Sequence, residues 1–410
     1  MSQTKAQLIS DLVQALNFTG TASAPANGVF LSATNTLAFA TNSGSRVTID
    51  SNGKATFSVD GVFNSVNIGK GANSVSGNTV LGENALDAAV TGANNTAIGK
   101  DSLTDNTSGA SNVAIGVNCL QDNTTGSNNV AIGHGSLRLG ETASNNTAVG
   151  RAVLNNCTGG NNTGLGYQVL NANTSGANNT GIGYNALVVN TTASNNTAVG
   201  RLALSANTTA ANNTALGSAT LEFNTTGANN TGLGRLALNG NTTASNNTAV
   251  GASALLSNTT GTANTAVGAA ALDASTVADN CTAVGKDALS ANTTGNSNTA
   301  VGKDALLTNT TGLQNCAFGV NALELNTTGQ DNTSVGKQSL ANNTTASNNT
   351  AVGSSALLAN TTGHSNVALG AQALENNTTA DYNVAVGLHA LRDNTTGERC
   401  NAFGADALGS

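Results

Sequence analysis

A glycine recurs every seventeen residues from Gly82 to Gly404, and one short framework accompanies it. The framework reads Gly, two variable residues, Ala-Leu, two more, Asn-Thr-Thr-Gly, two spacers and Asn-Thr-Ala-Val. The spacing shortens once, to sixteen, between Gly150 and Gly166. A fixed period of this kind is typical of a solenoid, in which each unit is one coil that buries its apolar side against its neighbours. The repeat therefore predicts an elongated body rather than a globule with a central cleft.

Composition narrows the classes of partner. Charged residues make up 9% of the chain and aromatic residues 3%, so a core of large side chains is excluded. The formal net charge is -7, without a basic cluster, and no uninterrupted apolar run approaches the length of a membrane span. We therefore expect neither nucleic-acid binding nor membrane insertion. The first residues lack the apolar run and cleavage site of a secretory leader, which predicts a protein used without secretion by its producer.

Each coil offers two apolar anchor positions, the residue before the glycine and the Leu five positions into the unit. We expect both to point inward. The tripeptide before the glycine, as in Thr147 to Val149, has strand character, and Ala-Leu is a candidate for a second short strand. The Asn-Thr-Thr-Gly segment is rich in turn-forming residues, and no 3.6-residue apolar stripe favours a helix. The predicted fold is all-β, a parallel β-solenoid (β-roll) of about twenty coils.

A backbone that winds once per unit places equal residues above one another in files. The Asn that precedes Thr-Ala-Val forms a nearly unbroken file, interrupted by Cys281 and Cys400, and stacked amides can hydrogen-bond from coil to coil. Thin coils with little interior also predict that several chains pack their apolar sides together. The structural positions that we single out are glycines Gly99, Gly116, Gly200 and Gly302, leucines Leu103, Leu120, Leu204 and Leu306, and asparagines Asn112, Asn129, Asn213 and Asn315.

The unit Asn-Thr-Ala-Val-Gly-x-x-Ala-Leu, seen at 196–204, resembles the Asn-Ser-Val-Ala-Ile-Gly head repeat of trimeric autotransporter adhesins. With its Asn-Thr-Thr-Gly turn, the full unit looks even more like the repeats of bacteriophage tail fibre proteins. The resemblance covers about residues 78–410 and implies a left-handed parallel β-roll in an intertwined or side-by-side homotrimer. Residues 37–42 followed by 46–54 resemble, more weakly, a short β-module found before such repeats in phage fibres.

The resemblance implies a non-enzymatic phage fibre that projects from the virion and supports attachment to a host-cell receptor, with a glycan as one candidate. An adhesin would need a secretory signal and a membrane-anchoring C-terminal domain, and neither is recognised here. Phage fibres of this kind often end in a self-cleaving chaperone, whereas this sequence stops inside a repeat at Gly409-Ser410. We therefore expect that such a domain was removed or that the chain is truncated. The alternatives are a capsid or tail decoration appendage of the same fold and a surface-polysaccharide depolymerase.

Three regions are predicted. Residues 1–20 contain a short amphipathic helix, which either attaches or trimerises the chain or folds back on its own module; its apolar stripe is Leu8, Ile9, Leu12, Val13 and Leu16. Residues 21–77 form a small β-module, with strands expected at 29–31, 37–40, 47–49 and 55–59. Residues 78–410 form the repeat shaft. By the resemblance, the N-terminal region contacts other virion proteins.

We expect no catalytic, cofactor or metal site. Asp287 and Asp304 share the third position in successive coils and are the best carboxylate pair for a glycosidase, yet each follows a Lys and fits a solvated surface column. His134, His364 and His389 fall at positions that do not favour a shared metal site. The five cysteines are an odd number without a common phase in adjacent coils, so we interpret them as free thiols.

Two further surface features have competing interpretations. Tyr167 and Tyr184 share the second position in neighbouring coils, and we favour a scattered surface pair over a patch that stacks on carbohydrate. The Asn-Thr-Thr turns could present ranked hydroxyls to ice. Adjacent threonines such as Thr191 and Thr192 would point to opposite sides of a strand, which disfavours ice binding.

Overall fold

The computed structural model describes residues 27–33, 36–41, 44–50, 52, 54–57 and 60–409. The predicted helix with Leu8, Ile9, Leu12, Val13 and Leu16 lies outside these residues. Where it is described, the chain is an all-β parallel β-solenoid of about 19 coils of 17 residues, preceded by a small sheet. It divides into two compact units, Met1–Ser127 and Asn128–Ser410, and each is described by itself.

The first unit begins with a small antiparallel sheet in the order β1-β2-β3-β4. Its four strands overlap the four segments predicted from sequence, although the last two residues of the predicted segment 55–59 lie outside the described residues. The turn after β3 is closed by the Asp50 carboxylate, which accepts hydrogen bonds from the backbone N–H groups of Asn52 and Lys54, both at 2.9 Å. The elements of the first unit are β1 Asn27–Ala33, β2 Thr36–Thr41, β3 Gly44–Ile49, β4 Ala55–Phe57, β5 Gly61–Phe63, β6 Val66–Gly69, the 3₁₀ turn η1 Ala72–Ser74, β7 Thr79–Gly82, β8 Thr96–Ile98 and β9 Val113–Ile115.

A hairpin covers the N-terminal edge of the first coils. Strands β5 and β6 pair antiparallel, and β6 pairs antiparallel with β7, after which β7, β8 and β9 run parallel. The η1 segment bonds to the other side of the first coil, where Ala72 N–H donates to the Leu86 carbonyl at 3.1 Å and the Asn73 side chain donates to the Val90 carbonyl at 3.0 Å. The edge of β7 is therefore covered by the hairpin, which leaves the short strand β5 as the edge of this sheet.

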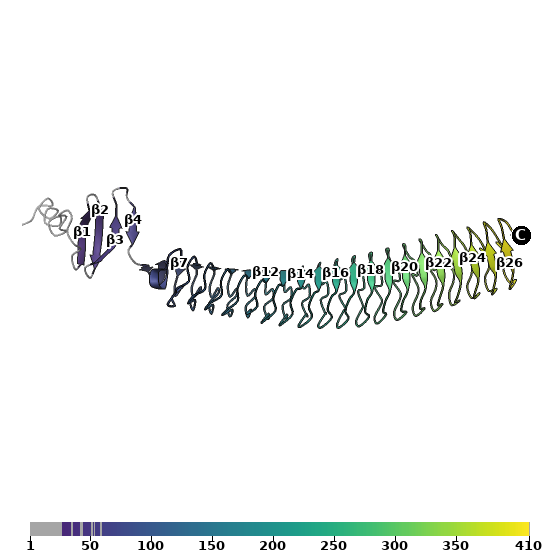
Figure 1. Ribbon diagram of the computed structural model, residues 1–410, viewed down its shortest axis with the longest axis horizontal. Helices are drawn as coiled ribbons and strands as arrows, with labels where there is room; N and C mark the ends of the chain where they lie inside the picture. The colour runs from purple at the N-terminus through teal and green to yellow at the C-terminus, as the bar shows by residue number, and fades with distance from the viewer. Residues whose placement is uncertain are drawn as a thin grey trace, which may run out of the picture. The chain divides into compact units, whose positions relative to one another are not determined.

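The second unit is a row of stacked coils with one three- to five-residue strand in each (Figure 1). Successive strands pair in parallel, with equal repeat positions opposite one another, as in Thr197 with Thr214. At about 4.8 Å per strand, this stack is roughly 77 Å long. Its strands are β10 Val130–Ile132, β11 Thr147–Val149, β12 Thr163–Tyr167, β13 Thr180–Tyr184, β14 Thr197–Val199, β15 Thr214–Leu216, β16 Thr231–Leu233, β17 Thr248–Val250, β18 Thr265–Val267, β19 Thr282–Val284, β20 Thr299–Val301, β21 Cys316–Phe318, β22 Thr333–Val335, β23 Thr350–Val352, β24 Val367–Leu369, β25 Val384–Val386 and β26 Asn401–Phe403.

The core of a coil differs from the prediction at one of its two anchors. In the strand Thr214–Leu216, the central Ala215 is fully buried, whereas Leu216 is 40% exposed. Side chains alternate along a strand, so an inward central residue forces both flanking residues outward. The expectation that the residue before each glycine points inward was therefore wrong, and the inward residue of the strand is the small Ala.

The second anchor, the Leu, is buried as predicted, but the Ala-Leu segment is a turn rather than a strand. Leu204 is fully buried and has a φ of 51°, in the left-handed region. That conformation costs a non-glycine residue about 1–2 kcal/mol, and burying a Leu side chain offsets it by about 1.5–3 kcal/mol. The turn still joins the coils, because Leu204 N–H donates to the Thr220 carbonyl of the following coil at 3.1 Å.

Two files of buried asparagine run through the stack. The predicted ladder at the Asn before Thr-Ala-Val is present: Asn213 N–H donates to Asn196 Oδ1 at 2.9 Å, and Asn213 Nδ2 donates to the Gly227 carbonyl at 3.0 Å. The Asn of Asn-Thr-Thr, which we had assigned only to a turn, forms a second ladder. There Asn224 Nδ2 donates to Asn207 Oδ1 at 3.0 Å, an amide-to-amide bond between coils.

Ser275 interrupts this second ladder, and its replacement by Asn should stabilise the protein. Buried Ser275 Oγ and buried Asn258 Oδ1 both have no hydrogen-bond partner. In Ser275→Asn, the new amide can donate to Asn258 Oδ1 and accept from Asn292, as its counterparts do in other coils. We expect a gain of about 1–3 kcal/mol in the free energy of unfolding, measured by denaturant titration. The reverse change in an intact part of the ladder, Asn241→Ser, should lower the free energy of unfolding by a similar amount. If both variants unfold with the same free energy as the wild type, the ladder does not stabilise the stack.

Candidate functional site

The singled-out repeat residues all serve the stacking of coils. Leu103, Leu120, Leu204 and Leu306 are fully buried, and Asn112, Asn129, Asn213 and Asn315 are buried at 1% exposure or less. Glycines Gly99, Gly116, Gly200 and Gly302 have φ between 127° and 142°. A Cβ at Gly200 would lie 2.2 Å from the Gly217 carbonyl oxygen, so only glycine permits the observed approach of the coils. These positions build the scaffold, and functional surfaces must be sought on what faces outward.

One such surface in the second unit is the outer face of the strands, which we call the strand face. It consists of the first and third residues of β10 to β26, which are mostly Thr at the first position and Val, Leu, Ile or Phe at the third. Neither position holds a charged residue in any of these strands. Several of the apolar residues are more than a third exposed, among them Leu216 at 40% and Phe318 at 41%. An uncharged, partly apolar strip of this length is unusual for a surface that contacts only water.

The strand face also changes the argument about threonine. The turn threonines considered from sequence bond to the next coil, as where Thr191 Oγ1 donates to the Thr208 carbonyl at 3.1 Å. The outward threonine file belongs instead to the strands, with Thr197 opposite Thr214 and Thr214 opposite Thr231. Sequence reasoning missed this face because it assigned the third strand residue to the core.

The carboxylate pair proposed as a glycosidase candidate lies in ion pairs. Asp287 pairs with Lys286 and Asp304 pairs with Lys303, each with the neighbouring residue in the chain. The ion pair stabilises the charged form of Lys286, and the side-chain hydrogen bond with Asp287 raises the pKa of that lysine. A glycosidase pair would need both carboxylates directed at one glycosidic bond, whereas each of these lies against the lysine that precedes it in the chain. The geometry agrees with the surface-column interpretation.

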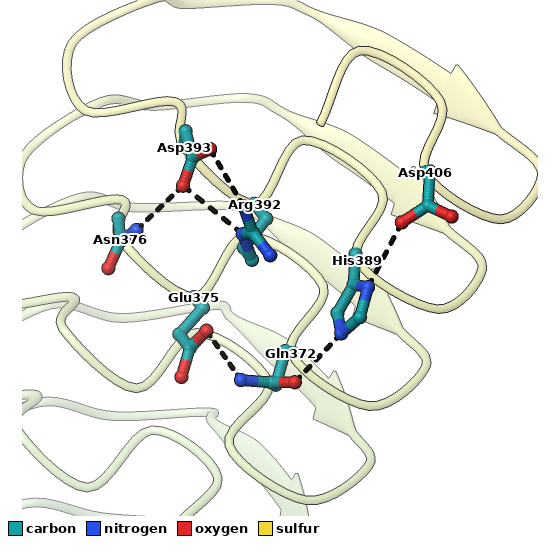
Figure 2. A network of polar contacts seen from close by, with 7 residues as sticks. All are labelled: Gln372, Glu375, Asn376, His389, Arg392, Asp393 and Asp406. Carbon is teal, nitrogen blue, oxygen red and sulfur yellow. Dashed lines mark hydrogen bonds and ion pairs between the residues drawn. The ribbon is translucent and has the colours of Figure 1, made fainter. Parts of the chain in front are cut away.

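The three histidines lie in separate surroundings. His364 Nδ1 accepts a hydrogen bond from Ser347 N–H at 2.9 Å, which joins two coils. His389 lies between Asp406, 3.0 Å from Nδ1, and Gln372, 2.8 Å from Nε2 (Figure 2). These two contacts join His389 to the coil before its own and to the coil after it. In the part of the chain that the structure describes, no three His, Cys, Asp or Glu residues gather as a metal site would require.

All five cysteines are free thiols, as predicted: Cys119, Cys157, Cys281, Cys316 and Cys400. Cys281 replaces an Asn of the first ladder, and its Sγ lies 3.2 Å from the Gly295 carbonyl. Burial raises the pKa of the Cys281 thiol from 9.0 to about 11, with hydrogen bonds from Asn298 and Ser297 acting in the opposite direction. These properties fit a buried packing residue that is not a reactive nucleophile.

The Cys281 thiol should make the protein less stable in alkali. Its folded pKa is raised, so the contribution to stability is complete below pH 9 and is lost as the pH rises through about 11. Two pKa units correspond to about 2.7 kcal/mol. We expect the free energy of unfolding to fall more steeply between pH 9 and 11 in the wild type than in Cys281→Asn, by denaturant titration. Parallel pH profiles in the two proteins would contradict this.

Tyr167 and Tyr184 form a contact rather than a scattered pair. Their rings are stacked, with centroids 5.4 Å apart and an interplanar angle of 6°. They lie at the ends of β12 and β13, which are two residues longer than the neighbouring strands and follow the sixteen-residue spacing. The Arg151 guanidinium lies over the Tyr167 ring, 5.6 Å from its centroid, and donates to the Tyr167 hydroxyl at 3.0 Å.

No protein-family model, curated protein or solved structure matches this chain. Among the residues that the structure describes, no helix is long and apolar enough to cross a membrane.

Proposed function

We propose that the chain is a structural, non-enzymatic subunit of a phage fibre. Three copies associate through their strand faces into a homotrimer that projects from the virion. The fibre contacts other virion proteins through its N-terminal region and supports attachment to a host-cell receptor. The observation that carries the proposal is the strand face, an uncharged and partly apolar strip along the whole second unit.

The dimensions of the strand face suit an interface between copies. A strip about 77 Å long and about 10 Å wide, the length of a three-residue strand, has an area of roughly 800 Å². That is about the surface that each partner buries in a standard protein–protein interface. Copies of one chain also share the rise per coil, so their outward Thr and Val files can match along the full length. Burial against other copies removes this apolar surface from water.

The interior suits a passive spacer. Each coil is bonded to the next through the strand, the Ala-Leu turn and two asparagine ladders, and equal contacts recur along the second unit. A structure of repeated nearest-neighbour contacts extends by adding coils and has no single hinge. Such a body can hold a receptor-binding surface at a distance from the particle. The phage assignment itself comes from the resemblance of the repeat to phage tail fibre repeats.

Sedimentation equilibrium of the purified chain tests the assembly. With a chain mass of 40.1 kDa, we expect a species of about 120 kDa that persists at micromolar concentration. A stable monomer would contradict the proposal. Labelling of intact virions with antibody against the β1–β4 sheet tests the location and distinguishes a tail fibre from a capsid appendage. Release of reducing ends from host polysaccharide would instead favour a depolymerase.

A further inference from the structure

The second position of the coil carries an exceptional run of side chains in the second unit. Five successive coils present His134, Arg151, Tyr167, Tyr184 and Arg201 at this position, and we call them the Arg-Tyr file. Backbone hydrogen bonds join the successive coils, which we call rungs of the file: Ala152 N–H donates to the His134 carbonyl at 2.9 Å and Leu202 N–H donates to the Tyr184 carbonyl at 2.9 Å. Each residue of the file directly follows the repeat glycine, and in β12 and β13 the strand continues through that glycine to Tyr167 and Tyr184. The file is therefore separate from the first and third strand residues that define the strand face.

The geometry of the file leaves hydrogen-bonding groups for a ligand. The two tyrosine rings stack on each other, so no sugar ring can enter between them. Their edges and hydroxyl groups remain, and Tyr184 is 50% exposed. The Tyr167 hydroxyl accepts a hydrogen bond from Arg151 and keeps its own proton to donate. Arg151, held by that bond and by its contact with the ring, has further N–H groups in a fixed plane.

The charge around the file is positive although the chain as a whole is negative. The sequence contains no Asp or Glu between Glu141 and Glu222, and both Arg151 and Arg201 lie in this interval and are exposed. Arginine binds carboxylate groups through two parallel hydrogen bonds, which gives such pairs both strength and direction. Arg151 and Arg201 are three rungs apart, roughly 14 Å at the strand spacing. Tyr167 and Tyr184 belong to the two coils between them.

We propose that the Arg-Tyr file binds an acidic polysaccharide that lies lengthwise along the rungs. Carboxylates of two separated sugar residues pair with Arg151 and Arg201, and the sugar hydroxyls between them bond to Tyr167 and Tyr184. This inference rests on the proposed function as a host-attachment fibre and names the receptor class. In a homotrimer the site occurs three times, so a long polymer gains avidity from several contacts.

Biolayer interferometry with immobilised polygalacturonate tests this site. We expect wild-type protein to bind, and the affinity to fall with rising salt. The double variant Arg151→Gln with Arg201→Gln should bind at least about tenfold more weakly. A matched control is Lys337→Gln with Arg399→Gln. It also removes two positive charges, Lys337 from the same repeat position in a distant coil and Arg399 from over the Tyr382 ring. The control should bind like wild type.

Three outcomes would overturn the site. If the control variant loses as much affinity as the double variant, the binding is unspecific charge attraction. If neutral dextran binds as tightly as polygalacturonate, the arginines do not select the ligand. If the protein binds polyphosphate but not polygalacturonate, the ligand is a phosphate polymer and not an acidic sugar. Far-UV circular dichroism and sedimentation of every variant show whether it is folded and trimeric. A trimer that fails to bind contradicts the acidic-glycan inference alone, whereas a monomer contradicts the proposed assembly.

Discussion

Replacing Gly234 with alanine should disrupt the stack at the centre of the second unit. A Cβ at this position would lie 2.5 Å from the carbonyl oxygen of Gly251 and 2.7 Å from its carbonyl carbon. Both are backbone atoms of the next coil and cannot rotate away. The φ of 130° adds strain for any residue with a side chain. We expect a loss of about 3–5 kcal/mol in the free energy of unfolding, since overpacking and backbone strain each cost about 1–3 kcal/mol.

The destabilisation by Gly234→Ala should first affect the coils next to residue 234 and only then the rest of the stack, because each coil contacts only its neighbours. Hydrogen exchange should accelerate first in β15 to β18, and the melting transition should broaden or split. Gly404→Ala is the matched control: its φ of 120° is similar, yet a Cβ there meets no atom within 4 Å. The control isolates backbone strain from the clash between coils. Equal melting of Gly234→Ala and wild type would show that the coils do not approach as closely as described.

Two glutamates on the strand face should convert the trimer to monomer. Val250 and Val267 are the third residues of β17 and β18 and face outward in adjacent coils. In Val250→Glu with Val267→Glu, association would bury six carboxylates without partners in each trimer. A buried unpaired charge costs several kcal/mol, so we expect association to weaken by a factor of about a thousand or more. Sedimentation velocity at micromolar concentration measures the result.

The control for this change places the same charges elsewhere on the same coils. Ala252 and Ala269 occupy the second position, are exposed and lie outside the strand face. Ala252→Glu with Ala269→Glu also places two carboxylates in adjacent coils. The repulsion between carboxylates within one chain is therefore similar in this control and in Val250→Glu with Val267→Glu. We expect the control to remain trimeric. If both double variants stay trimeric, the copies associate through a different surface; if both become monomeric, charge repulsion and not the strand face explains the loss.

The candidate sites were only partly foreseeable. That Tyr167 and Tyr184 share one file followed from their common repeat position, but their stacking with Arg151 depends on side-chain directions at the ends of β12 and β13. The second asparagine ladder was missed because Asn-Thr-Thr-Gly is typical of a turn. An Asn in a turn gives no sequence signal that its side-chain amide also bonds to a neighbouring coil. The segment without acidic residues between Glu141 and Glu222 was visible in the sequence. It indicated a candidate binding site only when the structure placed Arg151 and Arg201 on one file.

The period by itself determined the architecture. A residue that recurs once per turn must lie above its equivalent, so the parallel stacking, the buried Leu file and the first Asn ladder followed from spacing alone. The direction of the strand residues required the tertiary structure. In Thr-Ala-Val, the second and the third residue are both apolar. Because successive side chains of a strand point to opposite faces, either Ala or Val could point inward. Side chains of the Ala-Leu turn border the inward position of the strand: a Cβ built at Gly232 would meet Thr220 Cγ2 at 2.6 Å and Leu221 Cδ1 at 3.6 Å. This space favours a small residue such as Ala, so the larger third residue faces outward and forms the strand face.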